Sequence, residues 1–288
     1  MVADAGRTMD LDADLDVDAT DTGSPPPLLI DTHCHLGDVP LCDDEAGVLA
    51  RAQAAGVIAF VCPSADLPSS RIAVDLSRRH PGVVFAAAGL HPAYVQPGTP
   101  TDLSWLKAMI AAGGLVAVGE IGLDAAVTGA DLDAQERAFL AQAGLAREAE
   151  LPILVHVRKA FDRTVRVLES LGPGGPGGVL HAFGGSAELA ARLYRLGFLR
   201  GVGGTATRPG SARIRRAVAA TPLDAIVLET DAPFIGTDTR PAGRVEPADL
   251  PEIAHAVAGL LGLPIETVTA RTTNNARRLF CRDQEAKA

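Results

Sequence analysis

Short apolar runs alternate with polar turns and amphipathic stretches from residue 28 onward. This alternation is typical of βαβ units and predicts a parallel sheet. The runs expected to form strands are Leu28–Thr32, Val57–Val61, Val83–Ala88, Leu115–Gly119, Ile153–Val155, Val179–Leu180, Phe198–Val202 and Ile226–Leu228. The helices expected after them are Asp44–Ala55, Ser69–His80, Asp102–Ala112, Asp133–Glu150, Phe161–Leu171, Ser186–Leu196, Gly210–Ala220 and Pro247–Leu260, with a closing helix over Ile265–Phe280.

Eight strands alternating with eight helices favour a closed α/β barrel, the (β/α)8 or TIM barrel, over an open doubly wound sheet. No GxGxxG motif follows the first run, so a dinucleotide-binding fold would lack its phosphate cradle. The Gly- and Pro-rich stretch 172–178 is expected to be a loop away from the catalytic face, because a domain boundary there would leave incomplete strands. We therefore expect one barrel domain over residues 28–288.

The composition fits such a barrel and excludes some other classes. Hydrophobic residues make up 47% of the chain and aromatic residues only 4%, so the core must consist of Ala, Val, Leu and Ile. No long uncharged apolar run or signal peptide is found, which predicts a cytoplasmic protein without membrane contact. The four cysteines form no CxxC pair and are expected to be reduced thiols, with Cys34 buried by packing.

The formal net charge of −9 argues at first against a nucleic-acid partner. Residues 1–27 change that inference, because their seven Asp and one Arg carry −6 and leave −3 for residues 28–288. We expect this segment to be a disordered acidic tail. An over-extended start, with Met9 as a later start, is the alternative explanation.

Histidines and carboxylates occur where the predicted strands end. His33 and His35 end the first run, and their i, i+2 spacing puts both imidazoles on one face of a strand. An HxH pair alone is weak evidence for a metal site. Four later runs end in residues of the same kind, which are Glu120, His156, His181 and Asp231. Because the C-terminal ends of all strands meet at one mouth of a barrel, we expect these six side chains to be neighbours.

Imidazole and carboxylate ligands without thiolate suit zinc, manganese or, in part, magnesium. Histidines on both sides of a single glutamate suit two divalent ions bridged by Glu120. Two close cations would lower the pKa of a shared water and hold a phosphoryl oxygen. Asp231 is then placed to position that water or to accept its proton.

Six short motifs, in this order, resemble the signatures of the TatD family of metal-dependent deoxyribonucleases. They are DTHCHL at 31–36, GLHP at 89–92, GEIGLD at 119–124, VLHAF at 179–183, ETDAP at 229–233 and NARRLF at 275–280. Each motif is short, but the ordered set is specific and covers residues 29–280. The GVGGT sequence at 201–205 further resembles the YjjV-like branch of the family, whose substrate is poorly defined.

The resemblance implies roles for the six residues, position by position. It implies that His33 and His35 bind a first metal, that Glu120 bridges, and that His156 and His181 bind a second metal. The aspartate of the ETDAP motif matches the family's catalytic aspartate, which is also a ligand of the first metal. It further implies hydrolysis of DNA ends or single-stranded DNA, with 3′–5′ exonuclease activity if this chain follows its family.

Substrate contacts are less well determined by the sequence. His91 resembles a family residue that lines the site and contacts the scissile phosphate, and a structural cap is the alternative. Arg158, Lys159 and Arg208 are basic residues near the expected mouth. Arg158 fits a phosphate contact, whereas Lys159 is equally well explained as a solvated helix start. A carboxylated lysine bridging the metals, as in related amidohydrolase barrels, is unnecessary because the glutamate fills that role.

Some positions depart from the family pattern without touching the ligands. Ala125 and Ala126 stand where an aromatic residue often follows GLD, Gly185 replaces a Ser, and Val245 replaces an Asn. Because stacking platforms for single-stranded bases are normally aromatic, these changes weaken the inference of a DNA substrate. The alternatives are a metal-dependent hydrolase of a small amide, lactone or phosphoester, and a metal-binding scaffold without turnover. No stable protein partner is predicted.

Overall fold

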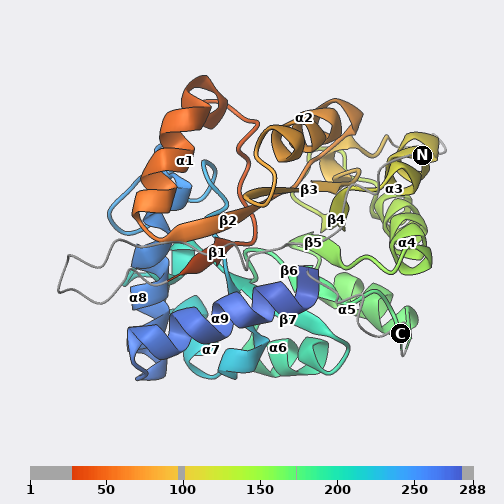
Figure 1. Ribbon diagram of the computed structural model, residues 1–288. Helices are drawn as coiled ribbons and strands as arrows, with labels where there is room; N and C mark the ends of the chain where they lie inside the picture. Colours follow the sequence, from red (N-terminus) through yellow and green to blue (C-terminus); the bar gives the residue numbers. More distant parts are fainter. Residues whose placement is uncertain (1–27, 97–100, 173, 281–288) are drawn as a thin grey trace, which may run out of the picture.

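The computed structural model describes residues 28–96, 101–172 and 174–280. Eight strands form one parallel sheet in sequential order, with helices on the outside (Figure 1). The strands are β1 (Leu29–Asp31), β2 (Val57–Cys62), β3 (Val84–Ala88), β4 (Leu115–Asp124), β5 (Ile153–Arg158), β6 (Gly178–Leu180), β7 (Phe198–Val202) and β8 (Ile226–Leu228). The α-helices are α1 (Glu45–Ala54), α2 (Leu67–Arg79), α3 (Ser104–Ala112), α4 (Leu132–Glu148), α5 (Phe161–Ser170), α6 (Ala187–Tyr194), α7 (Ala212–Ala219), α8 (Leu250–Leu261) and α9 (Ile265–Phe280).

Hydrogen bonds join the last strand to the first. Thr32, directly after β1, donates from its backbone N and its Oγ1 to the Leu228 carbonyl of β8, at 3.1 and 3.0 Å. The buried Asp31 carboxylate accepts from the backbone N and the Oγ1 of Thr230, at 3.0 and 2.6 Å, and from the backbone N of His33 at 3.2 Å. The prediction of a (β/α)8 barrel is confirmed.

The strands carry two separate apolar layers because successive side chains point to opposite faces. One cluster of buried residues joins the strands to the surrounding helices. The other consists of alternate strand residues such as Ala59, Ala87, Ala117 and Leu154, together with Ala276 and Phe280 of α9. Small residues thus fill much of the barrel interior, which agrees with the low aromatic content. Helix α9 contributes two side chains to this interior cluster.

Several sequence-based boundaries differ from the structure. β4 continues to Asp124, five residues beyond the expected end, and β5 continues to Arg158. β1 ends at Asp31, so His33 and His35 follow the strand rather than lie on it. Residues 174–177, which belong to the Gly- and Pro-rich stretch before β6, lead into that strand at its N-terminal end. The expected acidic tail, residues 1–27, lies outside the described residues.

The described residues include three of the four cysteines and all the helices that could be tested as membrane spans. Cys34 is fully buried, and its Sγ lies 4.0 Å from the Val61 carbonyl oxygen, in agreement with a packing role. Cys34, Cys42 and Cys62 are free thiols. No single described helix is long and apolar enough to cross a membrane. Pro247–Leu261 and Ile265–Phe280 pass that test only as a pair, and they are bent by 111° at their break.

Candidate metal centre and its cleft

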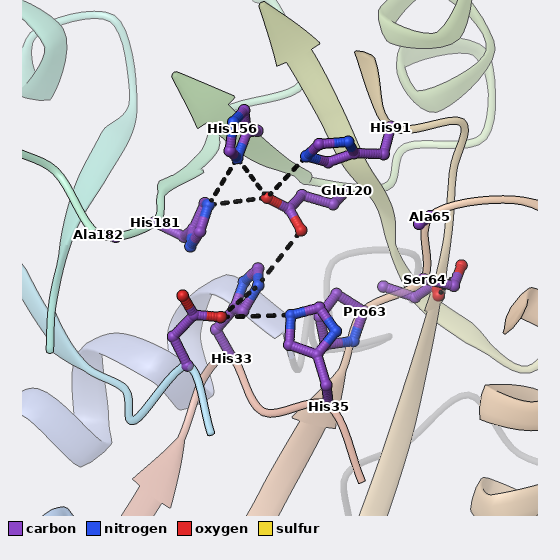
Figure 2. Close-up of polar contacts among 12 residues, drawn as sticks. His33, His35, Pro63, Ser64, Ala65, His91, Glu120, His156, His181 and Ala182 are labelled. Carbon is purple, nitrogen blue, oxygen red and sulfur yellow. Dashed lines mark hydrogen bonds and ion pairs between the residues drawn. The ribbon is translucent and has the colours of Figure 1, made fainter. Parts of the chain in front are cut away.

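The six predicted ligands lie together at the C-terminal ends of the strands. Figure 2 shows Glu120 between His33 on one side and His156 and His181 on the other. Glu120 Oε1 lies 2.8 Å from His156 Nδ1 and 2.7 Å from His181 Nε2. Its other oxygen, Oε2, lies 3.5 Å from His33 Nε2. The two oxygens of one carboxylate therefore face histidines from opposite sides of the barrel mouth.

A second group of donor atoms surrounds Asp231. Its Oδ1 lies 3.2 Å from His35 Nε2 and 3.7 Å from His33 Nε2. The His33 and His35 rings meet nearly edge to face, with centroids 5.1 Å apart. His33 belongs to this group and to the one around Glu120, so the two groups adjoin.

A local irregularity in β4 places Glu120 in the mouth. The register between β4 and β5 shifts between Val118 and Ile121, and the Gly119–Glu120 peptide is cis. The chain at this point bonds to Ser64, which follows β2: Glu120 N donates to the Ser64 carbonyl at 2.8 Å, and Ser64 N donates to the Gly119 carbonyl at 3.4 Å. Gly89, after β3, permits this approach, because a Cβ there would lie 2.9 Å from Gly119 backbone atoms. Glu120 thus lies within a strand, not at its end as expected.

Backbone hydrogen bonds join Asp231 and Ala232 to the segment that follows β1. Asp231 N donates to the His33 carbonyl at 2.8 Å, and His35 N donates to the Ala232 carbonyl at 2.8 Å. The Asp231 backbone has a φ of 51°, a left-handed conformation that Asp tolerates better than most residues. Because these bonds tie the segment after β8 to the segment after β1, three ligands are fixed by backbone contacts.

The remaining ligands are oriented by carboxylates that the sequence analysis did not single out. Asp124 Oδ2 lies 3.2 Å from His156 Nε2, which leaves Nδ1 of that ring facing Glu120. Glu229 Oε1 accepts a hydrogen bond of 2.5 Å from the backbone N of Ala182, the residue after His181. Asp124 ends β4, so the strand-end rule used for the ligands was the signal that could have identified it.

His91 both caps a helical turn and faces the centre. Its Nδ1 accepts a hydrogen bond of 3.1 Å from the backbone N of Ala93. Burial lowers the pKa of His91 to about 4, so the ring is neutral and its proton resides on Nε2. That nitrogen lies 3.7 Å from Glu120 Oε1. His91, Glu120 and His156 are close enough together to bind one metal ion. With its proton on Nε2, however, His91 faces the centre as a hydrogen-bond donor and not as a metal ligand.

The charges and free donor atoms of the centre fit divalent cations. Both ring nitrogens of His33 and Nδ1 of His181 are buried without a hydrogen-bond partner in the described chain. Burial, reinforced by the charge of His181, lowers the pKa of His33 to about 4 and keeps that ring neutral. Burial also lowers the pKa of His181, but Glu120 and Asp231 raise it to about 10. The carboxylates therefore attract positive charge into the centre.

The distances between the donor atoms also suit the binding of a metal ion. Ligands about 2.0 Å from a tetrahedral ion are about 3.3 Å apart, and the distances around Asp231 Oδ1 are 3.2 and 3.7 Å. Around Glu120 Oε1, the atoms His156 Nδ1 and His181 Nε2 are 3.1 Å from each other. All six residues can contribute to metal binding.

The centre opens into a cleft of about 710 Å³. Arg158 lines this cleft, together with Asp38 and Asp66. Arg208 does not line it, because its guanidinium donates to the Gly236 and Thr237 carbonyls. Lys159 is likewise not among the lining residues within the described chain. Of the three basic residues considered from the sequence, Arg158 alone reaches the cleft.

Comparisons with known proteins agree on the kind of centre. The metal-dependent hydrolase YabD of Bacillus subtilis, itself uncharacterized, is 34% identical over 253 residues, covering 88% of this chain and 99% of that protein. A protein of Erwinia billingiae named 3′-5′ ssDNA/RNA exonuclease TatD is 32% identical over 257 residues, with coverage of 88% and 98%. The crystal structure of the TatD homologue YjjV from Escherichia coli superimposes with a TM-score of 0.82 at 31% identity, covering 88% of this chain and 97% of that chain.

The family assignment rests on the whole barrel rather than on isolated motifs. The family model described as TatD related DNase matches residues 30–281, which include every strand except Leu29 of β1 and every residue of the centre. The ordered motifs at positions 31–36, 119–124 and 229–233 all contribute side chains to that centre. The chain belongs to the TatD-related DNase family.

Proposed function

We propose that this protein hydrolyses phosphodiester bonds at the ends of single-stranded DNA, with two divalent ions held in the centre. The observation that carries the proposal is the convergence of two adjoining donor groups on Glu120 and His33. In the proposed arrangement, His33, His35 and Asp231 hold one ion. The other is held by His156 and His181, with Glu120 shared between the two. Bound ions of this kind polarise a phosphoryl oxygen and lower the pKa of water.

Asp231 is the residue proposed to act on the attacking water. Its carboxylate is 6% exposed and lies at the bottom of the cleft beside His35. Burial raises its pKa, but the surrounding histidines lower it below the usual value, so the group is an ionised proton acceptor. Because Asp231 also lines the cleft, its ionised carboxylate can accept a proton from a water molecule there. Glu120 contributes to catalysis by keeping both ions in place.

His91 and Arg158 are proposed to contact the substrate phosphate. The Nε2–H of His91 points toward Glu120 and can donate to a non-bridging phosphoryl oxygen. Arg158 ends β5 with an exposed guanidinium that lines the cleft, where a phosphate of the strand can pair with it. The cap and phosphate interpretations of His91 are compatible, because each uses a different ring nitrogen.

One observation favours the alternative of a small amide, lactone or phosphoester substrate. Arg158 is the single Arg or Lys side chain lining the described cleft, whereas Asp38 and Asp66 also line it. A nucleic-acid backbone normally requires several cations.

We also propose, from the sequence, a cytoplasmic location and no stable protein partner.

A substrate panel distinguishes these possibilities. The protein loaded with Mn²⁺, Mg²⁺ or Zn²⁺ is incubated with end-labelled single-stranded DNA, duplex DNA and small esters, with and without chelator. The Glu120→Gln variant serves as the matched control. Chelator-sensitive shortening of single-stranded DNA that this variant lacks supports the proposal. Turnover of small esters alone supports the alternative, and metal binding without any turnover indicates a scaffold.

A further inference from the structure

The exposed aromatic side chains are concentrated at the mouth of the cleft. All eleven Phe, Tyr and Trp residues of the chain lie in the described part, and three of them are exposed. Phe234 is 54% exposed, Tyr94 50% and Tyr194 39%. Phe234 and Tyr94 line the cleft, whereas Tyr194 belongs to α6 and does not. Single exposed rings are common, but apolar surface gathered in a groove often marks a ligand-binding site.

The two cleft aromatics occupy equivalent positions in their loops. Tyr94 follows His91 by three residues, and its backbone N donates to the His91 carbonyl at 2.9 Å. Phe234 follows Asp231 by three residues, and its backbone N donates to the Asp231 carbonyl at 2.7 Å. Each ring is thus held by a tight turn whose first residue reaches into the centre. These bonds fix the backbone of both residues close to the centre.

Packing leaves part of each ring available. The Phe234 ring meets the His35 ring at 75°, with centroids 4.9 Å apart, and still exposes half of its surface. Ile72 of α2, which is 46% exposed, adds an apolar side chain to the same cleft. The cleft therefore offers flat or apolar surfaces beside the centre and a single guanidinium.

These surfaces identify the part of the substrate that the cleft can recognise. Stacking of bases on aromatic rings requires no positive charge, so it provides affinity where Arg158 is the one lining guanidinium. Paired bases inside a duplex already stack on their neighbours and cannot present their faces to these rings. We propose that Tyr94 and Phe234 are stacking platforms for unpaired nucleobases that flank the reacting phosphate. This inference rests on the proposed function and adds which side chains recognise the unpaired bases.

The test removes each partner of the stack in turn. Phe234→Ala and Tyr94→Ala are compared with wild type on single-stranded oligonucleotides, and on oligonucleotides with abasic nucleotides near the cleaved end. Loss of one base stack should raise KM by about 5- to 150-fold on the normal strand, with a smaller change in kcat. On the abasic strand the same variants should match wild type, because the partner ring is already missing.

Controls separate stacking from damage to the centre. Tyr194→Ala removes an exposed ring outside the cleft and should leave KM unchanged. Phe234→Trp and Tyr94→Phe keep a platform and should retain affinity, and metal content should equal wild type in all variants. Quenching of a terminal 2-aminopurine in a phosphorothioate oligonucleotide reports stacking without turnover, and both alanine variants should weaken it.

Different results overturn the two proposals separately. If wild type shortens single-stranded DNA but both alanine variants keep its KM and its quenching, the platforms are wrong and the proposed function stands. An equal loss on normal and abasic strands also overturns the platforms, since the effect would not depend on a base. If 2-aminopurine is quenched but no nucleic acid is hydrolysed, the proposed phosphodiesterase activity is wrong and the platforms stand.

Discussion

The inner centre and the outer rim of the cleft are built in opposite ways. In the centre, His33 is fully buried and Glu120 and Asp231 are 4% and 6% exposed. Backbone hydrogen bonds to His33 and Ser64 hold Asp231 and Glu120 in place. At the rim, Arg158 and Phe234 project into the cleft with exposed side chains. A change in the centre therefore disturbs several bonded partners, whereas a change at the rim removes one contact.

The largest effect is expected where the two donor groups join. Glu120→Gln keeps the side-chain size but removes the charge that faces His33, His156 and His181. We expect metal content to fall and turnover to drop by more than about 10⁴-fold, beyond the range for losing a single general base. Elemental analysis and single-strand hydrolysis measure this. A variant with full metal content would show that the centre does not depend on this carboxylate.

Substitution of Asp231 tests whether metal binding and proton transfer can be separated in the centre. Asp231→Asn keeps one oxygen ligand but cannot accept a proton, so most metal should be retained while turnover falls by about 10²- to 10⁴-fold. His33→Ala should instead lose metal and activity together. Near-normal hydrolysis by metal-loaded Asp231→Asn would place the base elsewhere and contradict the proposed mechanism.

Asp124 lies one contact further from the ions and should have a smaller effect. Asp124→Asn weakens the partner that fixes the tautomer of His156. Such outer partners typically contribute about 10- to 100-fold in metal affinity. Competition with a chromophoric chelator measures this loss, and excess metal should restore most of the activity. Failure of excess metal to restore activity would assign Asp124 a different role.

The salt dependence of binding tests the rim. The single lining guanidinium, Arg158, is expected to contribute a slope of log K against log salt of about −1 or shallower for a single strand. Arg158→Ala should flatten this slope, while Phe234→Ala should lower affinity at every salt concentration without changing the slope. Anisotropy titrations between low and moderate salt provide the values. A steep slope would mean that further cations bind the strand outside the cleft.

No effect on stability is expected at the chain's N-terminus. Deleting residues 1–27 should leave the melting temperature unchanged, because this composition buries too little apolar surface to offset chain entropy. Calorimetry of both chains measures this. A loss of several degrees would mean that the segment contacts the barrel.

The sequence predicted the barrel and six neighbouring candidate ligands because both follow from local patterns. Apolar runs indicate strands directly. The barrel brings the ends of all strands together even when the predicted strand boundaries are off by a few residues. Ser64 and the extension of β4 were missed, because Ser64 acts through tertiary backbone bonds to Gly119 and Glu120. Tyr94 and Phe234 were missed for a related reason. The exposure of a ring depends on the path of its loop, and no periodic pattern encodes that path.

The bonds between Asp31 and Thr230 join residues 199 positions apart. Contacts of such long separation form late, because a large loop must close before they gain any energy. His33 follows the first strand and its partner Asp231 follows the last, so the centre needs both ends of the barrel. A nascent or truncated chain therefore has no complete centre. The seam between the first and last strands therefore makes the proposed hydrolytic capacity depend on closure of the whole barrel.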